Sequence, residues 1–261
     1  IDLDQARRIV HTAEEHGTLL QVGHIERFNA ATQEAWKLCG APKYVRAERI
    51  SPFSFRSTDI GVVHDLMIHD LDLVADLVRS DVRRVEAFGV GLMGEHEDSV
   101  QARLVFENGC IADLTASRLS PVARRQMQVW SSSGTVTVDF TSREVTAYQP
   151  SDALLYGPSP VQRSRQPGAD VEQLKRDVFG HFLRIEQPAV PATDALTAEL
   201  IHFVECVRQG SQPLVGGEEA LRAMTLADAV LSSVAAHEWD GSAEGAIGPF
   251  ARSAATRKRA G

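Results

Sequence analysis

Residues Val62 to Val74 read VVHDLMIHDLDLV, an apolar helical pattern interrupted by acidic residues and histidines. Offsets of four and seven residues put Asp65, His69 and Asp72 on one face of this helix. An apolar stripe is expected beside them, made of Leu66, Leu73 and Leu77. A histidine between two carboxylates has its charged form favoured, so His69 could serve as a general base. A solvated helix face with structural ion pairs has the same residues, and the segment by itself allows both interpretations.

The segments around this helix predict a sheet. Seven runs are β-branched or alternate between apolar and polar residues, namely 44–51, 82–90, 99–107, 110–118, 125–131, 135–140 and 145–148. Residues 182–187 could form a final strand. Asn108-Gly109 is a strong hairpin signal between two of the runs, and Ser133-Gly134 marks a second turn. Consecutive strands of this kind predict an antiparallel sheet with the helix on one face.

The two ends of the chain have different patterns. A helix is predicted from Leu3 to about Ala13, followed by a stop at His16-Gly17 and a buried strand over 19–23. A helix and strand in this order are typical of the closing part of an α/β layer. Further helices are expected at about 196–210 and 218–237. A loop or insertion rich in Pro, Ser and Gly is expected at 150–168, and a disordered tail at 251–261.

Net charge and cysteine content exclude several classes of protein. The chain of 261 residues has a net charge of −8, which argues against nucleic-acid binding or a membrane-surface role. Its three cysteines are widely separated, which favours a reducing cytoplasm over a disulfide framework. No apolar run is long enough to span a bilayer. The 62–74 segment lacks the His-Glu-x-x-His spacing of zinc enzymes and no Cys/His cluster supplies other ligands, so no metal site is expected.

Four segments form a distinctive combination: QVGHIERFN at 21–29, SPF at 51–53 with RSTD at 56–59, DLMIHDLD at 65–72, and QPLVGGEEALRA at 212–223. Together they resemble the Gfo/Idh/MocA oxidoreductases, over a range from Ile1 to about His237. The first and third segments are most similar to the UDP-N-acetylglucosamine 3-dehydrogenases of that family. Related dehydrogenases for other UDP-sugars, inositol or glucose share the architecture and stay open.

The resemblance implies an α+β domain with a large, mainly antiparallel open sheet and helices on one face. Residues 1–30 would be the end of an NAD-binding Rossmann domain, residues 31–240 the substrate-binding and oligomerisation domain, and residues 241–261 a disordered tail. No Gly-x-Gly-x-x-Gly joins a strand to a helix and no Glu-Lys-Pro motif occurs, so most of the Rossmann domain is expected to be missing. We therefore expect the chain by itself neither to bind NAD tightly nor to turn over.

The implied reaction is oxidation of the 3-hydroxyl of UDP-N-acetylglucosamine, with NAD, or alternatively NADP, as cofactor. Asp65 and His69 match the family's Asp-x-x-x-His pair. His69 would take the hydroxyl proton as the hydride leaves, and Asp65 would orient the ring or a sugar hydroxyl. Asp72, one turn further on, would lie on the substrate side as a supporting or capping group. The lysine of the Glu-Lys-Pro motif would share the proton transfer.

His24, Arg27 and Asn29 are the candidates for contact with the cofactor. They follow the expected buried strand, and α/β proteins bind ligands at the carboxyl ends of strands. His24 has the position at which relatives keep a polar residue near the nicotinamide. Arg27 could equally be a surface arginine paired with Glu26.

Arg49 and Arg56 are the candidates for binding the diphosphate of the substrate, because an acidic protein must present local guanidinium groups to it. They flank Ser51-Pro52-Phe53, a loop just before the helix of His69. Arg49 could instead lie on the solvent face of a strand. Phe53 and Phe55 could stack on uracil, although loop aromatics more often pack on their own domain.

The resemblance also implies a homodimer or homotetramer joined through the exposed face of the sheet. A different class stays open: a non-catalytic sheet module used for binding or dimerisation. The upstream reading frame distinguishes the two, because Gly-x-Gly-x-x-Gly and Glu-Lys-Pro in it would support the enzyme.

Overall fold

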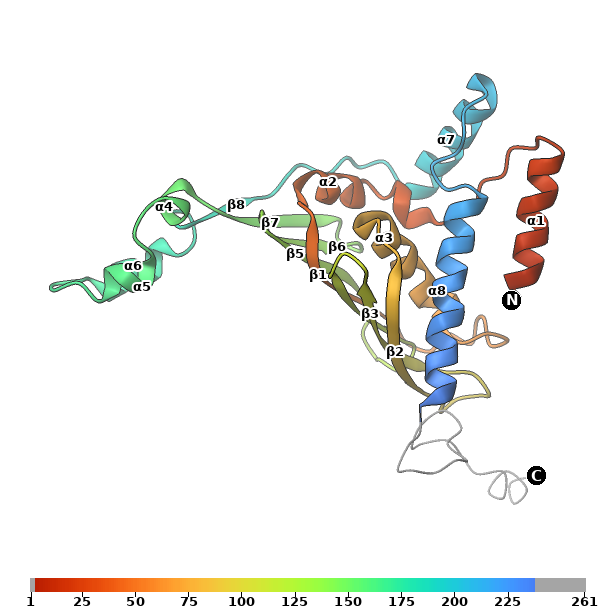
Figure 1. Ribbon diagram of the computed structural model, residues 1–261, viewed down its shortest axis with the longest axis horizontal. Helices are drawn as coiled ribbons and strands as arrows, with labels where there is room; N and C mark the ends of the chain where they lie inside the picture. Colours follow the sequence, from red (N-terminus) through yellow and green to blue (C-terminus); the bar gives the residue numbers. More distant parts are fainter. Residues whose placement is uncertain (1–2, 238–261) are drawn as a thin grey trace, which may run out of the picture.

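An eight-stranded open sheet is the centre of the structure, a computed structural model that describes residues 3–237 (Figure 1). The strands lie in the order β2-β3-β4-β1-β5-β6-β7-β8. Their bounds are β1 Pro42–Ile50, β2 Val82–Val90, β3 Ser99–Phe106, β4 Ile111–Ser117, β5 Arg124–Ser131, β6 Gly134–Asp139, β7 Glu144–Pro150 and β8 Leu183–Glu186. All neighbours are antiparallel except β1 and β4, which are parallel. The expected α+β class with a mainly antiparallel open sheet is confirmed.

The predicted strands coincide closely with these bounds, because β-branched residues or an alternation of apolar and polar residues mark them in the sequence. The strand predicted over 82–90 matches β2 at both ends. Gly109 has a φ of +83° in the turn between β3 and β4, as the Asn-Gly signal predicts. The predicted order, in which consecutive strands are neighbours throughout the sheet, is nevertheless wrong at one place. β1 lies between β4 and β5 and separates these two consecutive strands.

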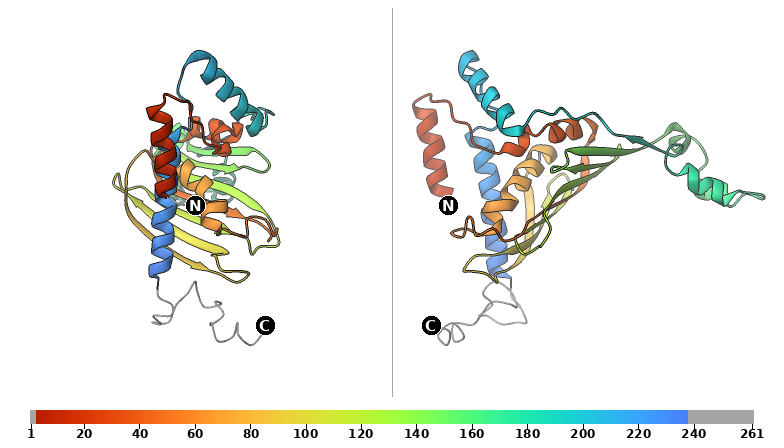
Figure 2. Two further views of the ribbon diagram at one scale, coloured as in Figure 1. Left: turned by 90° about the vertical axis from the view of Figure 1, so that its right-hand side faces the viewer. Right: turned by 180° about the vertical axis from the view of Figure 1, so that it is seen from behind.

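Three helices cover one face of the sheet (Figure 2). They are α2 (Ala30–Leu38), which packs on β6 and β7, α3 (Ile68–Val78), which packs on β1, and α8 (Gly217–Ala236), which packs on β2 and α3. Leu71, Leu73 and Val74 of α3 are fully buried in the core between these layers. Of the predicted apolar stripe, Leu73 lies in the core, while Leu66 and Leu77 are half-buried against it.

The helix that carries His69 does not begin as an α-helix. Its first turn is η2 (Val63–Met67), a π-helical turn, and α3 continues from it. A π turn holds more residues than an α turn, so α-helical offsets do not apply across it. The predicted stripe of Asp65, His69 and Asp72 therefore begins in a π turn and continues in α3. The predicted end of the helix is confirmed, because Arg79 caps α3 with a left-handed φ of +49°.

The N-terminal helix α1 (Leu3–Glu15) ends as predicted, and Gly17 follows it with a φ of +60°. The strand predicted over 19–23 is wrong: these residues pair with no strand of the described chain, and the Val22 N–H donates to the Val215 carbonyl at 3.0 Å instead. The chain then forms the short 3₁₀ helix η1 (Ile25–Phe28). Val10, the one buried residue of α1, packs against Gly217 of α8.

Residues between β7 and β8 form an arm that extends away from the sheet (Figure 1). The arm holds three short helices, α4 (Asp152–Leu155), α5 (Pro160–Ser164) and α6 (Val171–Asp177), so the prediction of a loop without elements is wrong. The final strand and the helix predicted at 196–210 are confirmed as β8 and α7 (Ala195–Gln209), which ends at Gly210. The tail predicted at 241–261 lies outside the described residues.

Polar and aromatic side chains cover the opposite face of the sheet, on which no helix of the described chain packs (Figure 2). Asp113 accepts hydrogen bonds there from Arg103 and from the Tyr44 hydroxyl, each at 2.7 Å, and Tyr44 packs on Trp130 with ring centroids 5.0 Å apart. We call this surface the open face. Among residues 3–237, no helix has the length and apolar character needed to cross a membrane.

Candidate active site

A buried ion-pair network lies beneath the first turns of α3. Arg49, on β1, is only 3% exposed, and its guanidinium donates to Asp70 at 2.8 Å and to Glu26 at 2.8 Å. Burial alone would raise the pKa of Glu26, but the Arg49 guanidinium outweighs burial and lowers it. Both expectations for Arg49 are therefore wrong. It is neither a solvent-facing strand residue nor free to bind a diphosphate, because its donors are used by two carboxylates.

A second buried network joins η1 to α3. Arg27 donates from Nε to Asp72 at 2.8 Å and forms an ion pair with Asp76 at 2.5 Å. Asp76 also accepts from the Trp36 indole at 2.9 Å. Arg27 is thus neither a surface residue paired with Glu26 nor available to the cofactor. Asp72 is 2% exposed and accepts from Arg27, so it holds the chain at 25–28 against α3 and is too deeply buried to meet a substrate directly.

His69 lies between these two networks and is half-buried. Burial, and then the positive charge of Arg49, lower the pKa of its imidazole to about 4. The expectation that neighbouring carboxylates favour the charged ring is wrong, because Asp70 and Asp72 are paired with arginines. Its Nδ1 is buried and has no hydrogen-bond partner within residues 3–237, and Nε2 is not among the buried atoms that lack a partner. The ring is neutral near pH 7 and has a nitrogen able to accept a proton.

His24 is the neighbour of His69 across the site. The two rings meet edge to face with centroids 6.2 Å apart, and Nδ1 of His24 is also buried without a partner. Burial lowers the pKa of His24, while Asp72 opposes the shift. Two uncharged imidazoles therefore line one side of the site, supplied by the segment before η1 and by α3.

Asp65 is not joined to His69. Its side chain is half-buried, and within residues 3–237 it makes no hydrogen bond to the imidazole. Asp65 lies within the π turn, whereas His69 lies in the first turn of α3. Its backbone N–H bonds the Gly61 carbonyl at 3.0 Å, which fixes the start of the turn.

The three residues predicted to contact the cofactor differ in what they can still bind. Asn29 caps α2 by accepting from the Ala31 N–H at 3.0 Å and donates to Glu26 at 3.0 Å, so its side chain has a structural role. Arg27 is occupied as described above. Of these three side chains, only His24 keeps a polar atom without a partner. Arg27 and Asn29 therefore do not fit the role of cofactor ligands in this structure.

The loop before η2 is held in place by two buried acids. Asp98 accepts from the Leu92 and Met93 N–H groups and from Arg118. Glu97 accepts from the Val63 N–H at 3.1 Å, at the start of η2. Phe53 packs under the Arg118 guanidinium and against Phe55, whose side chain is 84% exposed. The expected packing of a loop aromatic on its own domain holds for Phe53.

Arg56, the second predicted diphosphate ligand, lies exposed on this same loop. Its side chain makes no hydrogen bond or ion pair within the described part of the chain, so it stays a candidate. Glu26, Asp70 and Asp76 are the site residues that sequence reasoning missed. A signal for them was available, because two arginines flanked by apolar residues need buried carboxylates when the segment is not exposed.

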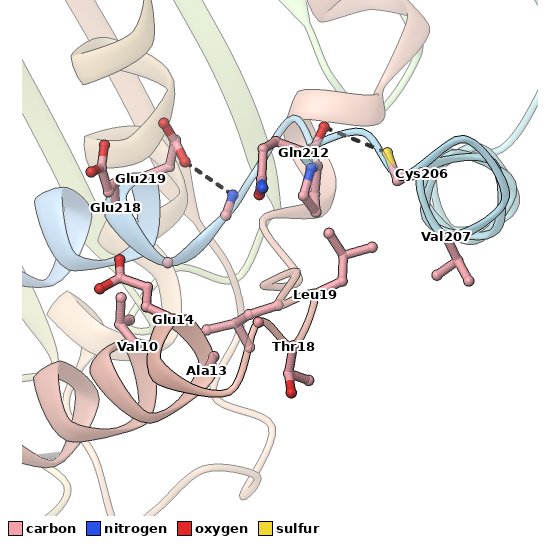
Figure 3. A pocket seen from close by; sticks show the side chains of 16 residues that line it. Val10, Ala13, Glu14, Thr18, Leu19, Cys206, Val207, Gln212, Glu218 and Glu219 are labelled. Atoms are coloured by element: carbon pink, nitrogen blue, oxygen red, sulfur yellow. Dashed lines mark hydrogen bonds between the residues drawn. The ribbon is translucent and has the colours of Figure 1, made fainter.

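A hollow near the N-terminus lies at a different place from this site. It has a volume of about 780 Å³ and lies between α1, the 17–20 segment, the end of α7 and the start of α8 (Figure 3). Val10, Leu19, Cys206 and Glu219 are among its lining residues, and His69 is not. Residues 3–237 also hold no cluster of His, Cys, Asp and Glu suited to a metal ion.

The site thus combines an open sheet with a histidine-bearing helix that lies on its covered face and begins in a π turn. The family model that matches residues 21–137 is the GFO/IDH/MocA C-terminal domain. The chain belongs to the GFO/IDH/MocA family of oxidoreductases, as its sequence motifs predict.

Two relatives show how far the similarity extends. The UDP-N-acetylglucosamine 3-dehydrogenase of Acidithiobacillus ferrooxidans is 36% identical over 149 residues, which cover 57% of this chain and 48% of that enzyme. Its solved structure matches with a TM-score of 0.74 and 30% identity, over 89% of this chain and 68% of that one. The scyllo-inositol 2-dehydrogenase (NAD(+)) of Bacillus subtilis is 23% identical over 231 residues, 82% of this chain and 60% of that enzyme. The chain thus spans about half the length of the first relative.

Proposed function

We propose that the chain is the substrate-side part of an NAD-dependent, or NADP-dependent, dehydrogenase that oxidises the 3-hydroxyl of UDP-N-acetylglucosamine. The observation that carries the proposal is the neutral, half-buried His69 between two networks in which arginine and carboxylate charges are already paired. The 36% identity to a UDP-N-acetylglucosamine 3-dehydrogenase supports the choice of substrate. The family's C-terminal domain covers the same residues.

His69 is the proposed general base. With its proton on Nδ1, the ring can accept the proton of the sugar hydroxyl at Nε2. The buried salt bridges of Arg49 and Arg27 fix α3 beneath the ring, so its position is set before the substrate binds. A pKa of about 4 keeps the ring uncharged at pH 7 but makes it a weak base. A second group must therefore stabilise the developing alkoxide, and the family's lysine has that expected role.

In an alcohol oxidation of this kind, a bound nicotinamide accepts the hydride. Because Arg27 and Asn29 are used structurally, His24 is the described residue that we propose lies next to the cofactor. The chain's own contribution is then limited to binding the sugar nucleotide and moving one proton. We also propose that Asp65 contacts a sugar hydroxyl, since its half-buried side chain makes no hydrogen bond to His69 within residues 3–237.

The test uses the 261-residue chain and the product of its complete reading frame. With NAD, the complete protein should form NADH from UDP-N-acetylglucosamine, in preference to its uronic acid and myo-inositol. His69→Ala should lower this rate by about two to four orders of magnitude, and His64→Ala on the same helix should leave it nearly unchanged. An unchanged rate in His69→Ala would give the base role to another group.

Calorimetry with NAD on the 261-residue chain should show no tight binding, and micromolar binding would overturn this expectation. Turnover by the complete protein separates the enzyme from a non-catalytic module. If the complete protein binds UDP-N-acetylglucosamine but forms no NADH from any of the three substrates, the module is supported. If myo-inositol is the preferred substrate, the reaction class stands and the substrate assignment is wrong.

We further propose a cytoplasmic homodimer or homotetramer joined through the open face. All three cysteines are free, as expected for a reducing compartment, and aromatic residues such as Trp130 and Tyr44 lie on that face. Light scattering of Trp130→Glu against wild type tests the assembly. A variant with the wild-type mass would place the interface elsewhere.

A further inference from the structure

Two adjacent arginines at the start of β5 lie on opposite faces of the sheet. Successive side chains of a strand alternate between faces. Arg124 lies on the open face, where it forms an ion pair with Glu48 at 2.9 Å. Arg125 is paired in register with Arg49 of β1, so both side chains lie on the face covered by helices. Arg49 reaches Asp70 of α3 from this face, which places Arg125 at the site of His69.

Arg125 differs from the other arginines of the site in its electrostatic environment. Arg49, Arg27 and Arg118 each meet at least one buried carboxylate. Arg125 is exposed, and its side chain forms no hydrogen bond or ion pair with any residue between 3 and 237. Its charge nevertheless acts on the site, because it helps to lower the pKa values of both His69 and Asp70 below what burial alone gives. The site therefore has a positive charge that the protein itself does not neutralise.

An anionic substrate needs such a charge. The chain has a net charge of −8, so its overall field repels a diphosphate. Arg49, which the sequence suggested for this contact, has no donor left for it. A guanidinium with all its donors free can bind two phosphate oxygens at once, with the charge-assisted geometry that arginine favours.

We propose that Arg125 binds the diphosphate of the sugar nucleotide and thereby places the sugar against His69. The inference rests on the proposed function, since it takes its ligand from that assignment. Arg125 acts on binding and orientation and takes no part in proton transfer. Arg124, one residue earlier and on the opposite face, has no role in it.

Calorimetry with UDP, UDP-N-acetylglucosamine and free N-acetylglucosamine tests this on the 261-residue chain. Arg125→Ala should weaken the binding of UDP and of the UDP-sugar by roughly tenfold to a hundredfold, the usual loss for a hydrogen bond to a charged group. Binding of the uncharged sugar should be unchanged. Arg125→Lys should recover part of the affinity, because it restores the charge without the two-pronged geometry. Arg124→Ala is the matched control and should bind all three ligands as wild type does.

The outcomes separate this inference from the proposed function. If UDP binding depends on Arg125 but the protein does not oxidise UDP-N-acetylglucosamine, the anion site is supported and the proposed substrate is wrong. Equal binding of UDP by wild type and Arg125→Ala overturns the inference, as does the absence of UDP binding by the wild type. Because Arg125 is exposed, the circular dichroism spectrum and melting temperature of Arg125→Ala should match those of Arg124→Ala. A loss of UDP affinity shared by both variants would also overturn the inference.

Discussion

Gly61 should tolerate an added methyl group poorly. It precedes η2, and a Cβ built on it would lie 1.9 Å from Oε1 of Glu97. Glu97 is itself only 6% exposed, and its carboxylate accepts the Val63 N–H at 3.1 Å. In Gly61→Ala the carboxylate must move, and no real Cβ occupies a contact this short. The start of the helix that carries Asp65 and His69 then loses the group that caps it.

The magnitude follows from two contributions. Overpacking a buried site costs about 1–3 kcal/mol. Losing a buried hydrogen bond to a charged acceptor costs about 1.5–3 kcal/mol. Gly61→Ala should therefore lower the free energy of unfolding by about 3–6 kcal/mol, a large part of the roughly 5–15 kcal/mol that a typical domain has.

Urea denaturation followed by tryptophan fluorescence measures this loss. Gly94→Ala is the control, because Gly94 is exposed with nothing within 4 Å of its added Cβ, and its stability should change by less than about 0.5 kcal/mol. If the clash with Glu97 is the cause, Gly61→Ala should cost less when measured in a Glu97→Asp background, where the carboxylate is one methylene shorter. A Gly61→Ala protein within about 1 kcal/mol of wild type would refute the reasoning.

Three further perturbations test other parts of the structure. Arg49→Met leaves two buried carboxylates without their cation and should lower the free energy of unfolding, measured in urea, by about 3–5 kcal/mol. Arg46→Met, on the open face of the same strand, should lower it by less than about 1 kcal/mol. Equal losses would contradict the buried network. The His69 imidazole should titrate near pH 4 by NMR. Since its folded pKa is below the usual 6.5, the unfolded chain binds more protons between these values, so this stabilisation is complete above about pH 6.5 and is lost as the pH falls toward 4; a midpoint near 6.5 would show that the ring is not buried as described. Gly217→Ala would bring a Cβ to 2.6 Å from Val10 and should weaken the packing of α1 on α8. Hydrogen exchange over residues 3–15 should then become faster. Unchanged protection would show that α1 docks by other contacts.

The strands could be predicted from the sequence because each one alternates between a buried and an exposed face. Residues 82–90 were placed correctly as β2, although only the second half of that strand alternates in burial. The order of the strands in the sheet could not be predicted in the same way. The pairing of β1 with both β4 and β5 depends on contacts between distant parts of the chain, which a local sequence pattern does not indicate.

The charged residues of the site show a similar limit. Arg49 looked like either a solvent-facing residue or a ligand for phosphate, and its buried partners lie 21 and 23 positions away in the sequence. Whether a charge is available to a ligand depends on what neutralises it in three dimensions. The π turn at η2 was also beyond local pattern, because no residue type marks the change from α-helical to π-helical spacing. His69 was identified correctly as the distinctive residue of the segment, but its charge state was not.

The position of β1 in the sheet has a consequence for how the chain folds. Strands β2, β3 and β4 follow one another along the sheet, as do β5, β6, β7 and β8, so each group can assemble from neighbouring hairpins. β1 alone joins them, with Tyr44 beside Ile111 on one side and Trp130 on the other. β1, which precedes the other strands of this sheet along the chain, must therefore wait for both groups, and closing these long loops should be the slow step of folding. Destabilising substitutions in β1 should slow refolding, whereas those in the β6–β7 hairpin should mainly speed unfolding.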